Sequence, residues 1–398
     1  MLEGKNVVLA VTGSIAAYKI ANLASMLKKQ KCKVTVMMTR NATNFINPIT
    51  FETLTGNKCL VDTFDRNFQY SVEHVSLAKE TDVVLVAPAS ANVIAKMAHG
   101  IADDMLTTTI LACECKKIVA PAMNTHMYHN PIVQDNLKLL EKYGMEIIKP
   151  DYGYLACGDI GDGKMPSEEV LFSYIEREIG REKDLAGKKV LITAGPTREA
   201  LDPVRFISNH STGKMGYALA HAAMLRGALV TLVSGPVSLA KPLFVNTIDV
   251  VSAQEMYEAV MERAEAQDIF IMAAAVADYT PKEQAAEKMK KKDGELSMEL
   301  CRTRDILQTV GDNHREDQFL CGFSMETENL LENSKAKLLK KHADMIAANS
   351  LRTEGAGFGT DTNVVTLITA DTCEELPMLS KEETAHAILD KISMKYKK

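Results

Sequence analysis

The chain has 398 residues, of which 46% are hydrophobic and 25% are charged, and its formal net charge is −6. These proportions are typical of a globular protein, and the length suits two domains of roughly 150 to 200 residues each. The acidic balance argues against a nucleic-acid partner, because proteins that bind nucleic acid concentrate positive charge on one surface.

No apolar run approaches the ~20 residues needed to cross a membrane, and the apolar core of residues 1–11 is too short for a signal peptide. The eight cysteines are scattered along the chain, which indicates reduced thiols rather than a disulfide framework. We therefore expect a cytoplasmic protein without a membrane partner.

Two segments share one pattern, in which a short lead-in precedes an apolar run that ends in glycine. Residues 2–13 are LEGKNVVLAVTG, and residues 185–195 are LAGKKVLITAG. Each pattern is typical of a buried parallel strand that leads into a loop. The repeat predicts two Rossmann-like α/β domains, with the boundary just before Asp184.

The first half alternates predicted strands with helices. Strands are predicted over residues 5–11, 33–38, 82–88 and 117–121, and helices over residues 14–30 and 167–179. Each predicted strand ends in small or polar residues, as expected where the carboxyl ends of parallel strands face a ligand. Residues 150–166 are rich in glycine and proline, which predicts a long functional loop or a connector without regular structure.

Four residues beside these predicted strands are candidates for binding or catalysis. Gly13 and Ser14 lie at a strand-to-helix turn, where backbone amides attract phosphate, although TGSIAAYK lacks the spacing of a dinucleotide fingerprint. His74 precedes the third strand, and Asn124 follows the fourth. A plain turn, a structural histidine and a helix cap are the respective alternatives.

Five segments of the first half match a known family in the same order. They are TGSIAAYK, the His74 segment SVEHVSLA, APASAN, PAMN with the following MY, and ACGDIGDGKM. In these motifs residues 1–180 resemble the phosphopantothenoylcysteine decarboxylases, which are FMN-binding enzymes of coenzyme A synthesis. The resemblance implies a flavodoxin-like domain that binds FMN through five residues: Gly13, Ser14, Thr39, Ser90 and Ala91.

The same resemblance implies roles for three further side chains. His74 would act as the base, Asn124 would hold the substrate carboxylate, and Cys157 would donate a proton from a flap over the substrate. These roles suit the chemistry, because decarboxylation of a cysteine amide needs an electron sink, which flavin supplies, and a thiol that completes protonation.

The second half continues the alternation of strands and helices. Strands are predicted over residues 188–193, 229–233, 244–251, 269–273 and 319–323, and helices over residues 213–226, 253–267 and 328–342. Residues 196–216 follow the first of these strands and lead into the first helix. A loop of this length indicates a binding function, although it fits neither a Walker loop nor a Rossmann fingerprint.

Three features of this half suit a phosphate ligand. The residues at the predicted helix N-terminus offer amides and positive charge to phosphate, with a solvated cap as the alternative: Ser211, Thr212, Gly213 and Lys214. Asp278, in AAAVADY, suits Mg²⁺ or a hydroxyl. The lysine-rich run 287–294, with Lys288, Lys290 and Lys291, is either a solvated loop or a mobile cluster that neutralises a triphosphate.

The second half also matches a known family over its whole length. The segments AGPTREALDPVRFISNHSTGKMG, AAAVADY, the lysine-rich run and GFSMET resemble the phosphopantothenate cysteine ligases in the same order. Bacterial members fuse decarboxylase and ligase in this arrangement. The resemblance implies a ligase domain over residues 184–398 that uses CTP and Mg²⁺ to join cysteine to 4′-phosphopantothenate through an acyl-cytidylate.

The ligase resemblance also implies site residues and assembly. Asn209 would hold the acyl-cytidylate, and Lys288 would stabilise charge during activation. The nucleotide would contact Ser211, Thr212, Gly213, Lys214, Ala274, Ala275, Asp278, Asp305, Ile306, Phe323 and Lys341, with Asp278 also serving the metal. Homo-oligomers are implied, as trimers or a dodecamer through the decarboxylase domain and as dimers through the ligase domain.

Two other functions are weighed against this hypothesis. A nicotinamide-dependent oxidoreductase would suit the double α/β pattern, but both dinucleotide fingerprints fail. A flavin-binding regulatory protein without turnover would keep the same fold. The presence of His74, Asn124 and Cys157 together argues against lost decarboxylase activity.

Overall fold

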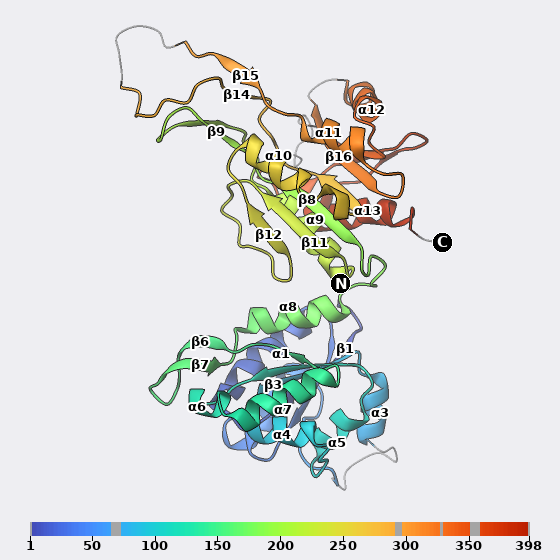
Figure 1. The fold of residues 1–398 in the computed structure, drawn as a ribbon. Coiled ribbons are helices and arrows are strands. Elements are labelled where there is room, and N and C mark those ends of the chain that lie inside the picture. Colours follow the sequence, from blue (N-terminus) through green and yellow to red (C-terminus); the bar gives the residue numbers. More distant parts are fainter. Residues whose placement is uncertain (1, 65–72, 291–296, 327–328, 351–358, 397–398) are drawn as a thin grey trace. The chain divides into compact units, whose positions relative to one another are not determined.

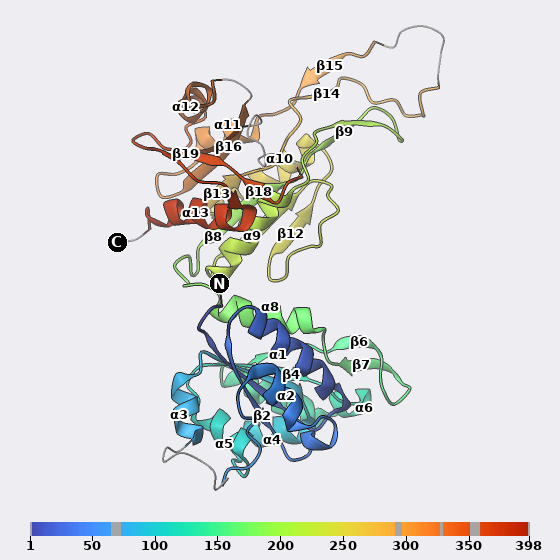
Figure 2. The ribbon, with the colours of Figure 1, turned by 180° about the vertical axis from the view of Figure 1, so that it is seen from behind.

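The computed structural model describes residues 2–64, 73–290, 297–326, 329–350 and 359–396. They form two compact units, Met1–Arg181 and Glu182–Lys398 (Figures 1 and 2). Each unit contains a largely parallel sheet with helices on both faces. The predicted fold class, two α/β domains, is therefore confirmed. Among the described residues, no helix has the length and apolar character required to cross a bilayer.

The first unit is built on a five-stranded parallel sheet in the order β2-β1-β3-β4-β5. Its strands are β1 Asn6–Val11, β2 Lys33–Met38, β3 Val83–Ala89, β4 Lys116–Pro121 and β5 Glu146–Ile147. Its helices are η1 Ile15–Tyr18, α1 Lys19–Lys29, η2 Ala42–Asn44, α2 Pro48–Thr55, α3 Glu73–Glu80, α4 Ala91–Ala98, α5 Met105–Ala112, α6 Thr125–Tyr128, α7 Pro131–Lys142 and α8 Glu168–Ile179.

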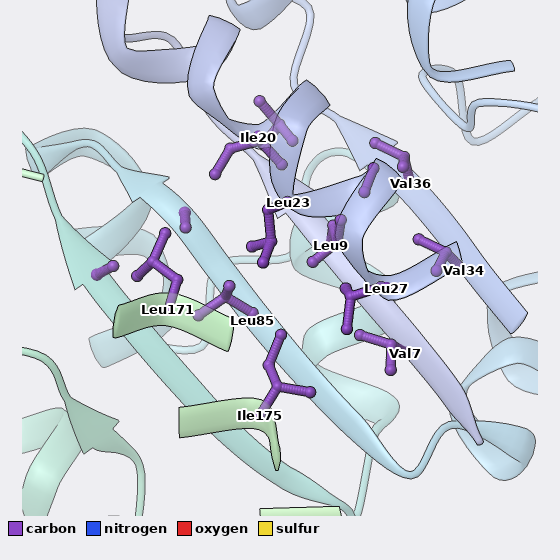
Figure 3. Packing of buried hydrophobic residues seen from close by; sticks show 14 of the residues in the cluster. Val7, Leu9, Ile20, Leu23, Leu27, Val34, Val36, Leu85, Leu171 and Ile175 are labelled. Atoms are coloured by element: carbon purple, nitrogen blue, oxygen red, sulfur yellow. The ribbon is translucent and has the colours of Figure 1, made fainter. Parts of the chain in front are cut away.

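Alternating residues of the central strands enter two different cores. On one face Leu9 packs with Leu23 of α1 and Leu171 of α8 (Figure 3). On the other face Val8 and Val84 pack against α4, α5 and α7. Fully burying one such side chain contributes roughly 1.5–3 kcal/mol. The apolar runs are therefore continuous in sequence because both faces of the sheet are covered.

The strand order fixes where a ligand can bind in this unit. The chain leaves β1 toward β2 on one side and later returns to β3 on the other side. Crossovers therefore diverge beside β1, and the carboxyl ends of β1 and β3 border a crevice. The turns that follow these strands begin at Thr12 and Ser90.

Two predictions for the first unit were wrong in detail. Residues 150–166 are not free of regular structure, because β6 Asp151–Tyr154 and β7 Ile160–Lys164 pair as an antiparallel hairpin. In β7 the side chains alternate with Gly161 and Gly163, and β6 contains Gly153, so the two-residue period was obscured in the sequence. The predicted helix 14–30 begins with a short 3₁₀ helix, η1, capped by the hydroxyl of Ser14.

The second unit contains an eight-stranded sheet in the order β12-β11-β8-β13-β16-β17-β19-β20. The first six strands in this order are parallel, β19 runs antiparallel to β17, and β20 runs antiparallel to β19. The strands are β8 Lys189–Ala194, β11 Leu229–Ser234, β12 Asn246–Asp249, β13 Ile269–Met272, β16 Phe319–Glu326, β17 Met345–Ser350, β19 Val365–Ile368 and β20 Cys373–Glu375.

Helices cover both faces of this second sheet. They are α9 Lys214–Leu225, α10 Ala253–Met261, η3 Ala264–Ala266, α11 Ile306–Asn313, α12 Leu330–Lys340 and α13 Lys381–Ser393. α9 and α13 pack on one face, and α10 and α11 pack on the other. The α-helix predicted over residues 253–267 ends earlier and continues as η3, and the strand predicted over residues 244–251 is shorter.

Short strands complete the second unit. They are β9 Arg198–Ala200, β10 Phe206–Ser208, β14 Tyr279–Pro281, β15 Leu300–Arg302, β18 Thr362–Asn363 and β21 Leu379–Ser380. The predicted binding loop 196–216 therefore contains the β9–β10 hairpin. Its two ends meet, because a Cβ atom on Gly213 would lie 3.4 Å from the backbone nitrogen of Gly195.

Candidate functional site

A cavity of about 490 Å³ opens at the carboxyl edge of the first sheet. The turn after β1 supplies Ser14, Ile15, Ala16, Tyr18 and Lys19, and the segment after β4 supplies Ala122, Met123 and Asn124. The β6–β7 hairpin closes another side with Tyr154, Leu155, Ala156, Cys157, Gly163, Lys164 and Met165. Segments far apart in sequence thus enclose one concave site, as ligand sites require.

Three polar side chains meet at the mouth of this cavity. The Nδ2 of Asn124 donates to Oδ2 of Asp159 at 2.9 Å and approaches Sγ of Cys157 at 3.4 Å. The thiol of Cys157 donates to the same oxygen of Asp159 at 3.3 Å. Oδ1 of Asn124 also accepts from the amide of His126 at 2.8 Å. Asn124 therefore caps α6 and still presents its amide to the cavity.

Two glycines allow the hairpin to approach the segment after β4. The carbonyl of Gly163 accepts from the amide of Met123 at 3.1 Å. A Cβ atom on Gly163 would lie only 2.2 Å from the carbonyl oxygen of Met123, and its φ of +124° disfavours other residues. A Cβ atom on Gly161 would lie 2.6 Å from Oγ1 of Thr125. The exposed Cys157 is thus brought to Asn124 by this close contact.

The five predicted FMN residues all lie at the carboxyl edge of the sheet. Four are in the turns after β1, β2 and β3, namely Gly13, Ser14, Thr39 and Ser90, and the fifth, Ala91, begins α4. The first two turns touch, since a Cβ atom on Gly13 would lie 2.9 Å from Cβ of Asn41. Of the five, Ser14 also lines the cavity with Asn124 and Cys157.

One residue that the sequence reasoning missed joins two of these turns. Oγ1 of Thr12 accepts from the amide of Ser90 at 2.9 Å and donates to the carbonyl of Pro88 at 2.6 Å. Thr12 is fully buried. A hydroxyl directly after an apolar strand was a signal available in the sequence, but its partners lie far along the chain.

His74 lies on α3, an element that supplies none of the described residues lining the cavity. It is half-buried on α3, which packs against α5. Among the described residues, His74 does not line the cavity. The predicted role of His74 as a base stays a prediction.

The second unit has a cavity of about 580 Å³ between the ends of β8, β13 and β16 and the helices α11 and α12. It brings together six of the predicted nucleotide residues: Ala274, Asp278, Asp305, Ile306, Phe323 and Lys341. These residues come from four separate parts of the sequence. Their convergence makes this cavity the candidate nucleotide site.

Two lysines of one helical run border this cavity. Lys341 donates to Oδ2 of Asp305, and Lys337 donates to the carbonyl of Phe323 at 2.8 Å. Burial opposes ionisation of Asp305, but the hydrogen bonds from Lys341 and from the amide of Gln308, together with the charges of Lys341 and Lys337, outweigh it and lower the pKa of this carboxyl. Lys337 was missed in the sequence, although its four-residue spacing from Lys341 indicated a shared helix face.

A smaller cavity of about 440 Å³ contains Asn209, Ser211 and Thr212 beside the β9–β10 hairpin. The side chain of Asn209 donates to the carbonyl of Ala275 at 2.9 Å. Ala275 follows Ala274, which lines the larger cavity. Asn209 therefore links this smaller cavity to the segment that lines the larger one.

The remaining predicted residues lie elsewhere in the second unit. Lys214 donates to the carbonyl of Gly359 at 2.8 Å and to Asp361 at 2.7 Å, so its side chain is engaged away from both cavities. Lys288 is exposed, as is Lys290, whereas Lys291 lies outside the described residues. Within the described part of the chain, no group of three or more His, Cys, Asp or Glu residues could hold a metal.

The fold and the first cavity define a two-domain α/β protein with a flavodoxin-like first domain. A family model named Flavoprotein matches residues 1–180, and the model of the DNA/pantothenate metabolism flavoprotein C-terminal domain matches residues 185–396. The chain therefore contains both domains of a pantothenate-metabolism flavoprotein.

Full-length relatives carry the comparison further. Coenzyme A biosynthesis bifunctional proteins CoaBC of Bacillus subtilis, Haemophilus influenzae and Vibrio vulnificus are 47%, 43% and 45% identical to this chain. The three matches cover 98–100% of this chain and 98–99% of the relatives. The chain belongs to this family of bifunctional coenzyme A biosynthesis enzymes.

Membership in this family confirms the predicted function. The enzyme combines an FMN-dependent phosphopantothenoylcysteine decarboxylase with a phosphopantothenoylcysteine synthetase, the cysteine ligase. The oxidoreductase and regulatory alternatives are therefore set aside. The individual roles of the site residues are not decided by these comparisons and stay predictions.

Proposed function

We propose that the first unit binds FMN and decarboxylates phosphopantothenoylcysteine in the cavity between Ser14 and the β6–β7 hairpin. The meeting of Asn124, Cys157 and Asp159 at the mouth of this cavity is the observation that carries the proposal. An amide that binds a carboxylate and a thiol that supplies a proton lie there within hydrogen-bond reach of each other.

The residues at the carboxyl edge fit the phosphate of FMN. The N-termini of η1 and α4 offer backbone amides, and Ser14 and Ser90 add hydroxyls. Gly13 keeps the adjoining turn free of a side chain beside Asn41. When bound, FMN would supply the electron sink that decarboxylation needs and would return the electrons afterwards.

In this reaction Asn124 would orient the carboxylate that leaves as CO₂. Cys157 would then deliver its Sγ proton to the carbon of the unsaturated thiol product. His74 would take up a proton as the base. Since His74 does not line the cavity of its own chain among the described residues, we propose that a second copy completes the site.

Cys157→Ser tests the role of the thiol. We expect the variant to bind FMN and release CO₂ but to form little of the saturated product, 4′-phosphopantetheine. Cys373→Ser, which changes an exposed cysteine of the other unit, is the control. CO₂ release and the thiol products are measured, the latter by mass spectrometry. Normal formation of the saturated product would show that Cys157 is not the proton donor.

We propose that the second unit activates 4′-phosphopantothenate with CTP and then transfers the acyl group to cysteine. The nucleotide would occupy the larger cavity, which Lys337 and Lys341 line together with Asp278. Asp278 suits Mg²⁺ that arrives with a triphosphate, because Mg²⁺ commonly binds one or two carboxylates together with substrate phosphates. Asn209 would hold the acyl-cytidylate beside Ala275, whose neighbour Ala274 lines the larger cavity.

Pyrophosphate release tests the nucleotide assignment. The full-length enzyme is incubated with 4′-phosphopantothenate, Mg²⁺ and one nucleotide at a time. We expect release with CTP and little with ATP, GTP or UTP. Equal release with ATP would overturn the choice of CTP without touching the ligase assignment.

We also propose homo-oligomers in the cytoplasm, as trimers or a dodecamer through the first unit and as dimers through the second. Tyr152, Tyr154 and Ile160 on the β6–β7 hairpin are each at least 64% exposed, which suits burial against another copy. Sedimentation of the full chain and of a Tyr152→Ser variant would measure the assembly.

A further inference from the structure

Asp202 is a buried carboxylate in the turn between β9 and β10. Its side chain has 0% exposure, whereas that of Arg205 is 43% exposed. Oδ1 accepts from the amides of Val204 and Arg205, both at 2.8 Å. A charge so deeply buried is tolerated only when it is paired and hydrogen-bonded.

The other oxygen of Asp202 faces a distant segment. Oδ2 accepts from Nε and Nη2 of Arg205 at 3.0 and 2.6 Å, and from the amide of Met289 at 3.1 Å. Nη2 of Arg205 also donates to the carbonyl of Met289 at 2.8 Å. Both backbone groups of Met289 are therefore bound by one Asp–Arg pair across more than 80 residues of sequence.

Met289 lies between two of the lysines of the lysine-rich run. Lys288 and Lys290 are exposed, while Met289 is half-buried. A second backbone bond, from the amide of Ala285 to the carbonyl of Leu201 at 3.0 Å, ties the same segment to the β9–β10 hairpin. The backbone is fixed at this point although the neighbouring lysine side chains extend into solvent.

We propose that Asp202 and Arg205 form a clamp that holds the backbone at Met289, so that Lys288 is presented to the nucleotide from a fixed position. Asp202 is a positioning residue in this scheme, because it acts through the backbone beside Lys288. The inference rests on the ligase function proposed for this unit and on the role in activating 4′-phosphopantothenate that the resemblance to the ligases implies for Lys288. Holding the chain before the nucleotide binds removes an ordering cost from the reaction.

The substitution Asp202→Asn is designed to disrupt the clamp while keeping the hydrogen bonds of the β9–β10 turn. The variant keeps an oxygen for the two amides of the turn, but it turns an NH₂ group toward the Met289 amide and the Arg205 guanidinium. Hydrogen-bond donors then face one another at the clamp, with no acceptor between them. Asp317→Asn is the matched control: Asp317 also binds a nearby arginine, Arg315, which donates to the distant carbonyl of Glu265 outside both cavities.

The experiment uses the full-length enzyme and two readouts. Trypsin cleavage after Lys288 and Lys290, followed by mass spectrometry, reports whether the segment is held. Pyrophosphate release with saturating CTP and 4′-phosphopantothenate reports activation. We expect Asp202→Asn to speed cleavage and to slow release about tenfold or more, while Asp317→Asn changes neither.

A double-mutant comparison distinguishes positioning from mere stability. If Asp202 acts through Lys288, Asp202→Asn will slow release much less in a Lys288→Ala background than in the wild type. An equal factor in both backgrounds would overturn the clamp. Unchanged cleavage and release in Asp202→Asn would also overturn it, whereas no release by the wild type would instead refute the role proposed for this unit.

Folding of the variants is checked within the same chain. Decarboxylation of supplied phosphopantothenoylcysteine reports the first unit, and thermal unfolding reports the second. If Asp202→Asn fails to fold, Arg205→Lys provides the same test, because lysine keeps the charge but lacks the paired donors that reach both Asp202 and Met289. Normal cleavage and release in folded Arg205→Lys would then overturn the clamp.

Discussion

Asp159 meets both of the residues proposed to act on the substrate in the first unit. One oxygen accepts from the amide of Asn124 and from the thiol of Cys157. It therefore fixes the direction in which each group points before the substrate binds. Orientation of this kind reduces the entropy cost of reaching the reactive geometry.

Asp159→Ala tests this orientation. We expect FMN binding to be retained and formation of the saturated product to slow by about 10- to 100-fold, because Asn124 and Cys157 lose their common acceptor. Asp162→Ala is the control on the same hairpin, since Asp162 pairs with His129 at 2.9 Å. Equal slowing by the two variants would contradict a specific role for Asp159.

At the scale of single residues, the sequence identified side chains with recognisable chemistry better than their partners. Cys157 and Asn124 were selected from motifs, and the structure brings them together. Asp159 and Lys337 were missed because the role of each depends on a contact: Asp159 contacts Asn124, and Lys337 contacts Phe323. Nothing in the local sequence indicates which distant group will lie within hydrogen-bond distance.

At the scale of elements, the β6–β7 hairpin depends on Gly163. Gly163→Ala would place a methyl group against the carbonyl of Met123, at an ideal separation of 2.2 Å. We expect the hairpin to shift and decarboxylation to fall at least ~100-fold, because small displacements of a positioned group are costly. Turnover measurements on full-length protein would check this, with ligase activity as the internal control.

Gly144→Ala is the matched control for backbone strain. Gly144 also has a positive φ, +82°, but no atom lies within 4 Å of its ideal Cβ position. This variant should cost about 1–2 kcal/mol of stability and leave decarboxylation near the wild-type rate. Similar losses of activity in both variants would show that strain alone, and not the contact with Met123, explains the effect.

Arg226 joins α9, the start of the second unit and α13. It is 5% exposed, and it donates to Asp184 and, at 2.7 Å, to Asp390. Arg226→Met should destabilise the second unit by about 3–5 kcal/mol, because the carboxylate of Asp184, whose side chain is 15% exposed, loses the guanidinium. Urea unfolding followed by ligase activity measures this loss.

Arg263→Met is the control for the loss of an arginine in the same unit. Arg263 pairs with the exposed Glu262 and donates to the carbonyl of Ala259. Such surface pairs contribute about 0–1 kcal/mol. A loss of stability as large as that of Arg226→Met would contradict the prediction that the buried Arg226 contributes more than a surface arginine.

Elements with continuous apolar runs were the ones that the sequence predicted well. β2 was predicted with its observed bounds, and all of β3 is buried. The β6–β7 and β9–β10 hairpins were missed, because their strands are short and their pairing depends on contacts with neighbouring turns. Local propensity is a weak guide where tertiary contacts stabilise the strand.

At the scale of the whole molecule, the two units have separate cores. Among the described residues, each buried apolar cluster lies wholly within one unit. Units with their own cores are expected to fold independently. Residues 1–181 expressed alone should retain FMN binding and decarboxylation, and residues 182–398 alone should retain ligation.

Differential scanning calorimetry of each fragment and of the full chain would measure this independence. The two fragment transitions should account for the transitions of the full chain. A fragment that remains unfolded and inactive would show that one unit needs the other for its stability despite the separate cores.

Separate cores on a single chain also have a consequence for stoichiometry. Every translated molecule carries one decarboxylase unit and one ligase unit, so synthesis cannot change the ratio of the two activities. Damage can change it, because a lesion that unfolds one unit leaves the core of the other intact. Ageing of the enzyme would therefore appear as a drift in the ratio of the two activities rather than as a uniform loss.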